Sequence, residues 1–78
     1  MKLQELRQQA KLSQSELARL SGVKVRSIQE FEYGRRSVDT TKLATLVALA
    51  DALQEPLYNL LDDKELAEKV KNNVKREV

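Results

Sequence analysis

Residues 13–34, SQSELARLSGVKVRSIQEFEYG, decide the fold, because they predict a helix, a tight turn and a second helix. The four residues SQSE at the start of this stretch form a capping box, with Ser13 as the N-cap and Glu16 reaching back from the third helical position. Gly22 supplies the unusual backbone conformation that the turn needs. The stretch therefore predicts a helix-turn-helix unit.

The side chains of this unit have separate mechanical tasks. Ala18 must be small, because the second helix crosses closely over the first at this position. Ile28 and Phe31 lock the second helix against the core and leave its other face open. A helix, a glycine and a helix alone would describe an ordinary αα-hairpin equally well. DNA binding is favoured by the full set at these spacings: Gln14, Leu17, Ala18, Gly22, Val23, Ile28 and Phe31.

The composition restricts the class of protein. The 78 residues suit one small domain, and there is no cysteine or histidine. The commonest general base, the commonest neutral metal ligand and any disulfide are therefore missing. We see no nucleophile–base pair, metal-ligand cluster or phosphate loop, so we expect no enzyme, no cofactor and no small-molecule ligand. No apolar run reaches the length of a membrane span, and the N-terminus is no signal peptide, so we expect a soluble cytoplasmic protein.

The charge is unevenly distributed along the chain. The net charge is +2, but residues 1–37 hold eight basic and four acidic residues, whereas residues 38–78 hold six basic and eight acidic ones. The excess of positive charge lies in the half that contains the helix-turn-helix. A polyanion is a plausible partner there, although a solvated charged face would give the same composition.

The remaining sequence predicts further helices and no strand, hence an all-α bundle. We expect helices at roughly 3–11, 14–20 and 25–33, a fourth from Thr40 or Thr41 to Leu53, and a fifth opened by Pro56. Besides the residues above, we expect the following to face inward: Leu3, Leu6, Ala10, Leu20, Glu32, Leu43, Leu46, Val47, Leu49, Ala50, Leu53, Leu57, Leu60 and Leu61.

The C-terminal stretch 63–78 is charged and amphipathic, and Asp62 is a candidate cap for it. Leu66, Val70 and Val74 are spaced by four residues, which is too short a pattern for a coiled coil. The stretch is either a dimerisation helix or a tail that packs back on the body or stays in solvent. We therefore divide the chain into a domain at 1–62 and an extension at 63–78.

The stretch from Leu6 to Leu61 resembles the Xre/Cro-type helix-turn-helix family, which includes the lambdoid phage repressors. The resemblance rests on LRQQAKLSQSELARLSGV, RSIQEFEYGRR and LVALADALQEPLYNLL. It implies a compact five-helix lambda-repressor-like DNA-binding domain. It also implies a sequence-specific regulator of transcription, a dimeric repressor that binds a double-stranded DNA operator with the recognition helix, about 25–33, in the major groove.

The resemblance assigns base contacts to the recognition helix. Arg26 would fork onto guanine O6 and N7, and Val25 would touch a thymine methyl group. Glu30 departs from the neutral Gln often found at its position. It would accept a hydrogen bond from cytosine N4, or it would pair with Arg26 and only orient it. The complete base-contacting set is Lys24, Val25, Arg26, Gln29 and Glu30.

The resemblance also implies phosphate contacts, from Ser13, Gln14, Tyr33, Arg35 and Arg36. Gln14 opens its helix, where exposed N–H groups and the helix dipole favour an anion. The alternatives are a plain polar residue at a helix start and a solvated basic loop.

The phage repressors further hold a partly buried Arg–Glu pair at the positions of Arg7 and Glu32, so we expect the same pair here. Its task would be structural, because an unpaired buried charge is costly.

The alternative function is that of an antitoxin-like module that neutralises a partner protein. Some proteins of this fold act in that way, and many of them also bind their own operator. The acidic second half of the chain and its amphipathic tail are compatible with this role.

Overall fold

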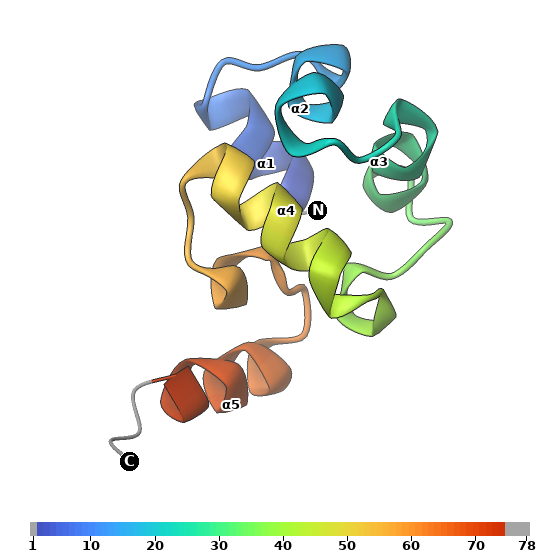
Figure 1. Cartoon of the computed structure of the whole chain (residues 1–78). Helices are drawn as coiled ribbons and strands as arrows, with labels where there is room; N and C mark the ends of the chain where they lie inside the picture. The colour runs from blue at the N-terminus through green and yellow to red at the C-terminus, as the bar shows by residue number, and fades with distance from the viewer. Residues whose placement is uncertain (1, 75–78) are drawn as a thin grey trace.

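Helix α4 crosses the centre of the molecule, and the other helices surround it (Figure 1). The structure is a computed structural model that describes residues 2–74, and these residues contain helices and turns only. The elements are α1 (Lys2–Gln9), α2 (Gln14–Ser21), α3 (Val25–Glu32), the 3-10 turn η1 (Val38–Thr40), α4 (Leu43–Leu53), the 3-10 turn η2 (Leu57–Leu60) and α5 (Lys64–Val74). The expected all-α, five-helix fold is confirmed.

The core is built from the inward faces of α1 to α4 and the two 3-10 turns. Phe31 is the largest fully buried side chain, and α4 alone contributes four buried residues. Burial of apolar surface on this scale is the main force that holds a domain without disulfides or metals together. The buried apolar residues are Leu3, Leu17, Ile28, Phe31, Val38, Leu46, Leu49, Ala50, Leu53, Leu60 and Leu61.

Four residues predicted to be buried are instead exposed, and one of them is Ala10, just after α1. Leu20 is 51% exposed, Leu43 64% and Val47 42%. The apolar side of α4 is wider than the surface that its main neighbours, α2 and η2, cover. Leu43 and Val47, one turn apart, lie beside the arc of buried residues, so their apolar character does not reflect the core.

Several predicted boundaries also differ. The fourth helix begins at Leu43, because residues 38–40 form a 3-10 turn in which the Ser37 hydroxyl accepts a hydrogen bond from the Asp39 amide at 3.1 Å. The helix expected after Pro56 is the 3-10 turn η2. The first helix ends at Gln9, because Lys11 has a left-handed backbone with φ of 60°. The fifth α-helix is therefore α5, which lies in the predicted extension.

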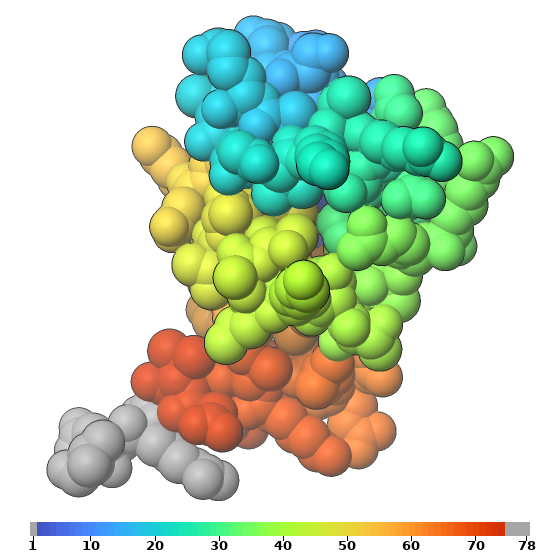
Figure 2. Space-filling model, turned by 45° about the vertical axis from the view of Figure 1, so that its right-hand side comes forward, coloured from blue at the N-terminus to red at the C-terminus, as the bar shows by residue number. Residues whose placement is uncertain are grey.

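Helix α5 packs back on the body at the end of the molecule away from α2, as both views show (Figures 1 and 2). Leu66, Ala67 and Val70 pack against the core, whereas Val74 is 68% exposed. For residues 64–74, this arrangement matches the expectation of a helix that returns to the body. Residues 75–78 of the predicted extension lie outside the described residues.

The cap of α5 is Asp63 and not the predicted Asp62. The Asp63 carboxylate accepts hydrogen bonds from the amides of Glu65 and Leu66 at 2.9 and 3.2 Å. Asp62 instead accepts a hydrogen bond from the Lys2 amide at 3.2 Å. An N-cap directly precedes the first helical residue. Because α5 begins at Lys64, its cap is Asp63 and not Asp62.

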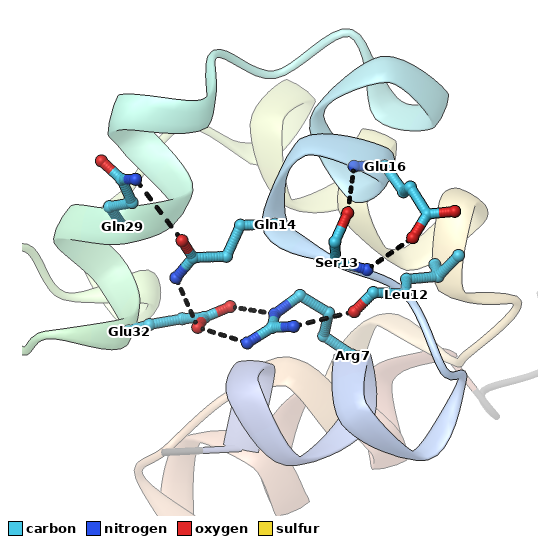
Figure 3. Close-up of polar contacts among 7 residues, drawn as sticks. All are labelled: Arg7, Leu12, Ser13, Gln14, Glu16, Gln29 and Glu32. Atoms are coloured by element: carbon cyan, nitrogen blue, oxygen red, sulfur yellow. Dashed lines mark hydrogen bonds and ion pairs between the residues drawn. The ribbon is translucent and has the colours of Figure 1, made fainter.

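The start of α2 carries the predicted capping box (Figure 3). The Ser13 hydroxyl accepts from the Glu16 amide at 3.0 Å, and the Glu16 carboxylate accepts from the Ser13 amide at 2.9 Å. The hydrogen bond from the Ser13 backbone lowers the pKa of Glu16 below its ordinary value. The box therefore fixes the residue at which α2 begins.

The turn between α2 and α3 depends on Gly22, which has a φ of +74° and donates to the Ala18 carbonyl at 2.9 Å. A Cβ placed on this residue would meet no atom within 4 Å. Glycine is therefore required here for its backbone conformation and not for space.

A buried carboxylate connects α1, α2 and α3 (Figure 3). Arg7 donates from Nε to Glu32 Oε2 at 2.7 Å and from Nη2 to Oε1 at 3.0 Å, which is a bidentate pair. Arg7 also donates from Nη1 to the Leu12 carbonyl at 2.8 Å. Gln14 donates from Nε2 to Glu32 Oε1 at 3.0 Å. The expected Arg7–Glu32 pair is confirmed, and Gln14 is an additional partner.

The network keeps Glu32 ionised despite its burial. Removal from water would by itself raise the pKa of this carboxyl group. The hydrogen bonds from Arg7 and Gln14 and the charge of Arg7 outweigh that effect, so the pKa of Glu32 lies below its ordinary value of 4.5. The hydrogen bond to Glu32 in turn raises the pKa of Arg7. The pair is therefore charged at neutral pH.

The backbone of Gly22 allows a test of the turn. We expect Gly22→Ala to lower the free energy of unfolding by about 1 kcal/mol, because an L-residue is strained at this φ. Gly22→Asn should cost less, since Asn adopts the left-handed conformation more readily. Urea denaturation of both variants measures the difference. A loss for Gly22→Asn that equals or exceeds the loss for Gly22→Ala would show that added side-chain bulk, and not φ, is what the turn rejects.

Loss of Arg7 should be far more damaging than loss of an exposed cation. Arg7→Ala leaves the Glu32 carboxylate buried without its charged partner, and we expect a loss of about 3 kcal/mol. The matched control is Lys69→Ala, because Lys69 pairs with Glu65 at 3.5 Å with side chains 73% and 81% exposed. That surface pair should contribute less than about 0.5 kcal/mol. If both variants melt alike, the buried pair is not structural.

The pH dependence of the free energy of unfolding should reflect the ionisation of Glu32. Because its pKa is lowered in the folded state, its contribution is fully present above the ordinary pKa of 4.5 and is lost as the pH falls below that value. We therefore expect Glu32→Gln to be less stable than the parent at pH 7, with the difference shrinking at pH 3. Urea titrations at both pH values measure it. A difference that stays constant would contradict the assignment.

Candidate nucleic-acid interface

Helix α3 has one buried face and one open face. Ile28, Phe31 and Glu32 are buried, as predicted. Lys24 is the N-cap of the helix in an extended conformation, and it is followed by Val25 and Arg26 on its first turn. These three residues are all exposed, Val25 at 37%. The structure therefore brings the first three predicted base-contacting residues together at one end of α3.

Gln29 and Glu30, the other two predicted base-contacting residues, are partly covered. Gln29 donates from Nε2 to Gln14 Oε1 at 3.4 Å (Figure 3). Since Gln14 also donates to Glu32, its side-chain amide links the buried pair to the open side of α3. Gln14 lies at the start of α2, next to α3, and its predicted phosphate contact stays a prediction.

Glu30 pairs with a different arginine from the one expected. Its carboxylate lies 3.6 Å from Arg36 Nη1, and no ion pair within residues 2–74 includes Arg26. Arg26 and Glu30 are four residues apart on one helix, a spacing at which a pair can form. The expectation that Glu30 orients Arg26 is therefore wrong for this structure, and Arg36 takes that place.

Arg36 is anchored in the loop after α3 by four contacts. Its guanidinium donates to the Ser27 hydroxyl at 3.2 Å and to the Thr41 hydroxyl at 3.4 Å. The guanidinium carbon also lies 4.8 Å from the centre of the Phe31 ring, a cation–π distance. Together with the ion pair to Glu30, these contacts give Arg36 a structural role that the sequence did not indicate.

The other predicted phosphate-contacting residues lie on the surface around α3. Tyr33 is 61% exposed, and Arg35 and Ser13 are exposed as well. Gly34, with φ of +77°, turns the chain so that the amides of Arg35 and Arg36 both donate to the Glu30 carbonyl, at 2.8 and 3.2 Å. In Figure 2 this loop, in green, projects beside the surface of α3.

Sequence reasoning missed Ser27 and Thr41 as partners of Arg36. Ser27 could have been found, because it precedes Glu30 by three residues and thus shares its side of α3. Thr41 could not, because its approach depends on the path of the loop and on η1.

Among residues 2–74, no group of three or more acidic, cysteine or histidine residues could hold a metal ion. No helix there is both long and apolar enough to cross a membrane.

A helix-turn-helix family model matches residues 3–60, from α1 through η2. No curated protein and no solved structure matches the chain. The family match covers well over half of the sequence and contains α2, the Gly22 turn and α3. The chain therefore belongs to the Xre/Cro-type helix-turn-helix family, whose members are DNA-binding regulators of transcription.

Proposed function

We propose that this protein is a sequence-specific, homodimeric repressor of transcription that acts in the cytoplasm. The observation that carries the proposal is that α3 has one buried side and one exposed side. Its buried side is locked by the Arg7–Glu32 pair, and its other side presents exposed Val25 and Arg26. A helix held in this way meets the major groove in one fixed orientation.

The side chains at the start of α3 suit direct reading of bases. Arg26 reads guanine through O6 and N7, and Val25 contacts a thymine methyl group. Glu30 accepts from the N4 amino group of cytosine, while Lys24 and Gln29 add further contacts. Ser13, Gln14, Tyr33 and Arg35 form the surrounding phosphate contacts. These phosphate contacts set the position of the protein on the duplex and do not themselves read sequence.

The exposed side of α4 supports a homodimer. Leu43 and Val47 are 64% and 42% exposed and lie one turn apart, and Leu20 borders the depression that also contains Ala48. Exposed apolar clusters of this kind mark interaction surfaces. In Figure 2, α4 faces the viewer directly beside the region of α3. Pairing through α4 would let the two copies of α3 enter successive major grooves about one DNA turn apart, as an operator with two half-sites requires.

Repression follows from occupancy, because a dimer bound over a promoter blocks access of the polymerase.

A second candidate function, an antitoxin-like module that masks a partner protein, is supported by a groove of about 610 Å³ between α1, η2 and α5. Its lining is mixed in charge and includes Glu5, Tyr58 and Lys71. In that case the partner would bind away from α3, so both activities could coexist.

DNA binding should be steeply dependent on salt. We expect in-vitro selection from random duplexes to yield a motif of two half-sites. The affinity should fall with salt, with a slope of about 0.9 per phosphate contact in a double-logarithmic plot.

Arg26→Ala should relax the preference at one base pair per half-site, whereas Arg35→Ala should weaken all sequences alike and lower the slope by about 1. No binding even at low salt would reject the DNA-binding reading of the site and favour the partner-protein role.

The dimer interface can be tested by adding a charge. We expect sedimentation of the parent to show a dimer, and Val47→Glu to shift it to a monomer, because burying a carboxylate in an apolar interface is unfavourable. The matched control is Val74→Glu on α5, where Val74 is 68% exposed. That variant should remain dimeric. Dissociation of the control alone would place the interface on α5, and a monomeric parent would contradict the dimer.

A further inference from the structure

The Arg36 guanidinium is held in place before any ligand is present. Ser27 and the Phe31 ring contact it from α3, and Thr41 contacts it from the segment after η1. The planar group keeps one orientation because its hydrogen bonds and its ring contact all depend on that plane. Glu30 Oε1 lies 3.6 Å from Nη1 within this arrangement.

The ion pair with Glu30 has little value for stability. The Arg36 and Glu30 side chains are 44% and 31% exposed, so water and salt screen their attraction. A carboxylate on the open side of α3 is nevertheless a problem for a DNA-binding surface, because phosphates repel it. Arg36, in the loop after α3, compensates the negative charge of the Glu30 carboxylate. The pair therefore matters more for binding than for folding.

The same contact affects Arg26. Arg26 is the other cation within reach of Glu30, at the i, i+4 spacing on α3. An Arg26–Glu30 pair would occupy the guanidinium that is to read guanine. Because Arg36 already engages Glu30, Arg26 stays exposed at the start of the helix.

We propose that Arg36 is a positioning residue for base recognition: it holds the Glu30 carboxylate in place for its base and prevents Glu30 from capturing Arg26. This inference rests on the proposed DNA-binding function and assigns Arg36 a role other than a phosphate contact. Two base pairs are then affected by one residue that touches neither of them.

The test is in-vitro selection with the full chain, for the parent, Arg36→Ala, Arg36→Lys, Glu30→Gln and the double variant Arg36→Ala/Glu30→Gln. Arg35→Ala is the matched control in the same loop. Circular dichroism melting identifies any variant that does not fold. Arg36→Lys keeps the positive charge, so it provides the test if Arg36→Ala is unfolded.

We expect Arg36→Ala to lower the preference at the base pairs read by Glu30 and by Arg26, each by about fivefold, the low end of what one base contact contributes. In the Glu30→Gln background, loss of Arg36 should leave the preference at the Arg26 base pair unchanged, because no carboxylate remains to capture Arg26. Arg36→Lys should restore part of the preference.

A uniform loss of affinity in Arg36→Ala, with the parent motif retained and the salt slope lowered by about 1, would make Arg36 a phosphate contact and overturn the inference. An unchanged motif in Glu30→Gln would overturn it as well. A parent that selects no motif would instead reject the proposed function, so the two failures are distinguishable.

Discussion

The rest of the structure depends on one buried carboxylate. Glu32 is only 6% exposed and must find partners within the protein, since an ionised carboxyl group without them would be strongly destabilising. Arg7 comes from α1 and Gln14 from α2, so satisfying Glu32 fixes three helices at once. Apolar packing of Ile28 and Phe31 would tolerate small rotations of α3, whereas a bidentate ion pair does not. The orientation of the open face thus follows from the chemistry of the buried one.

Features that depend on a few neighbouring residues could be predicted from the sequence. The capping box needs only Ser13 and Glu16, and the turn needs only the φ that Gly22 permits. The Arg7–Glu32 pair spans 25 residues and was expected from the family resemblance alone. The choice of partner for Glu30 could not be predicted, because Arg26 on the same helix and Arg36 in the loop both lie within reach. The path of the loop after Gly34 decides between them.

The exposed side of α4 shows that an apolar sequence pattern does not always predict burial in the core. Its apolar stripe predicts burial for Leu43 and Val47 as firmly as for Leu46 and Leu49, but only the latter two are covered by the rest of the chain. A pattern of apolar residues indicates that one side of a helix is apolar. It does not indicate whether the core or another molecule covers that side. The start of α4 was misplaced for a related reason. Residues 38–40 form η1, and Thr41 after it has an extended backbone, so α4 begins only at Leu43.

Glu30 and Glu32 show how two carboxylates on one helix come to serve opposite purposes. They are two residues apart, so they project from different sides of α3. Glu32 lies in the core, where its partner Arg7 is only 11% exposed and their attraction is weakly screened. Glu30 lies in partial contact with water, where its pair with the more exposed Arg36 contributes little to folding. Exchange of residue 32 must therefore disturb the whole fold, whereas residue 30 can vary with little effect on stability. Under the proposed function, a substitution at residue 30 changes the sequence that the domain reads while the position of the reading helix stays the same.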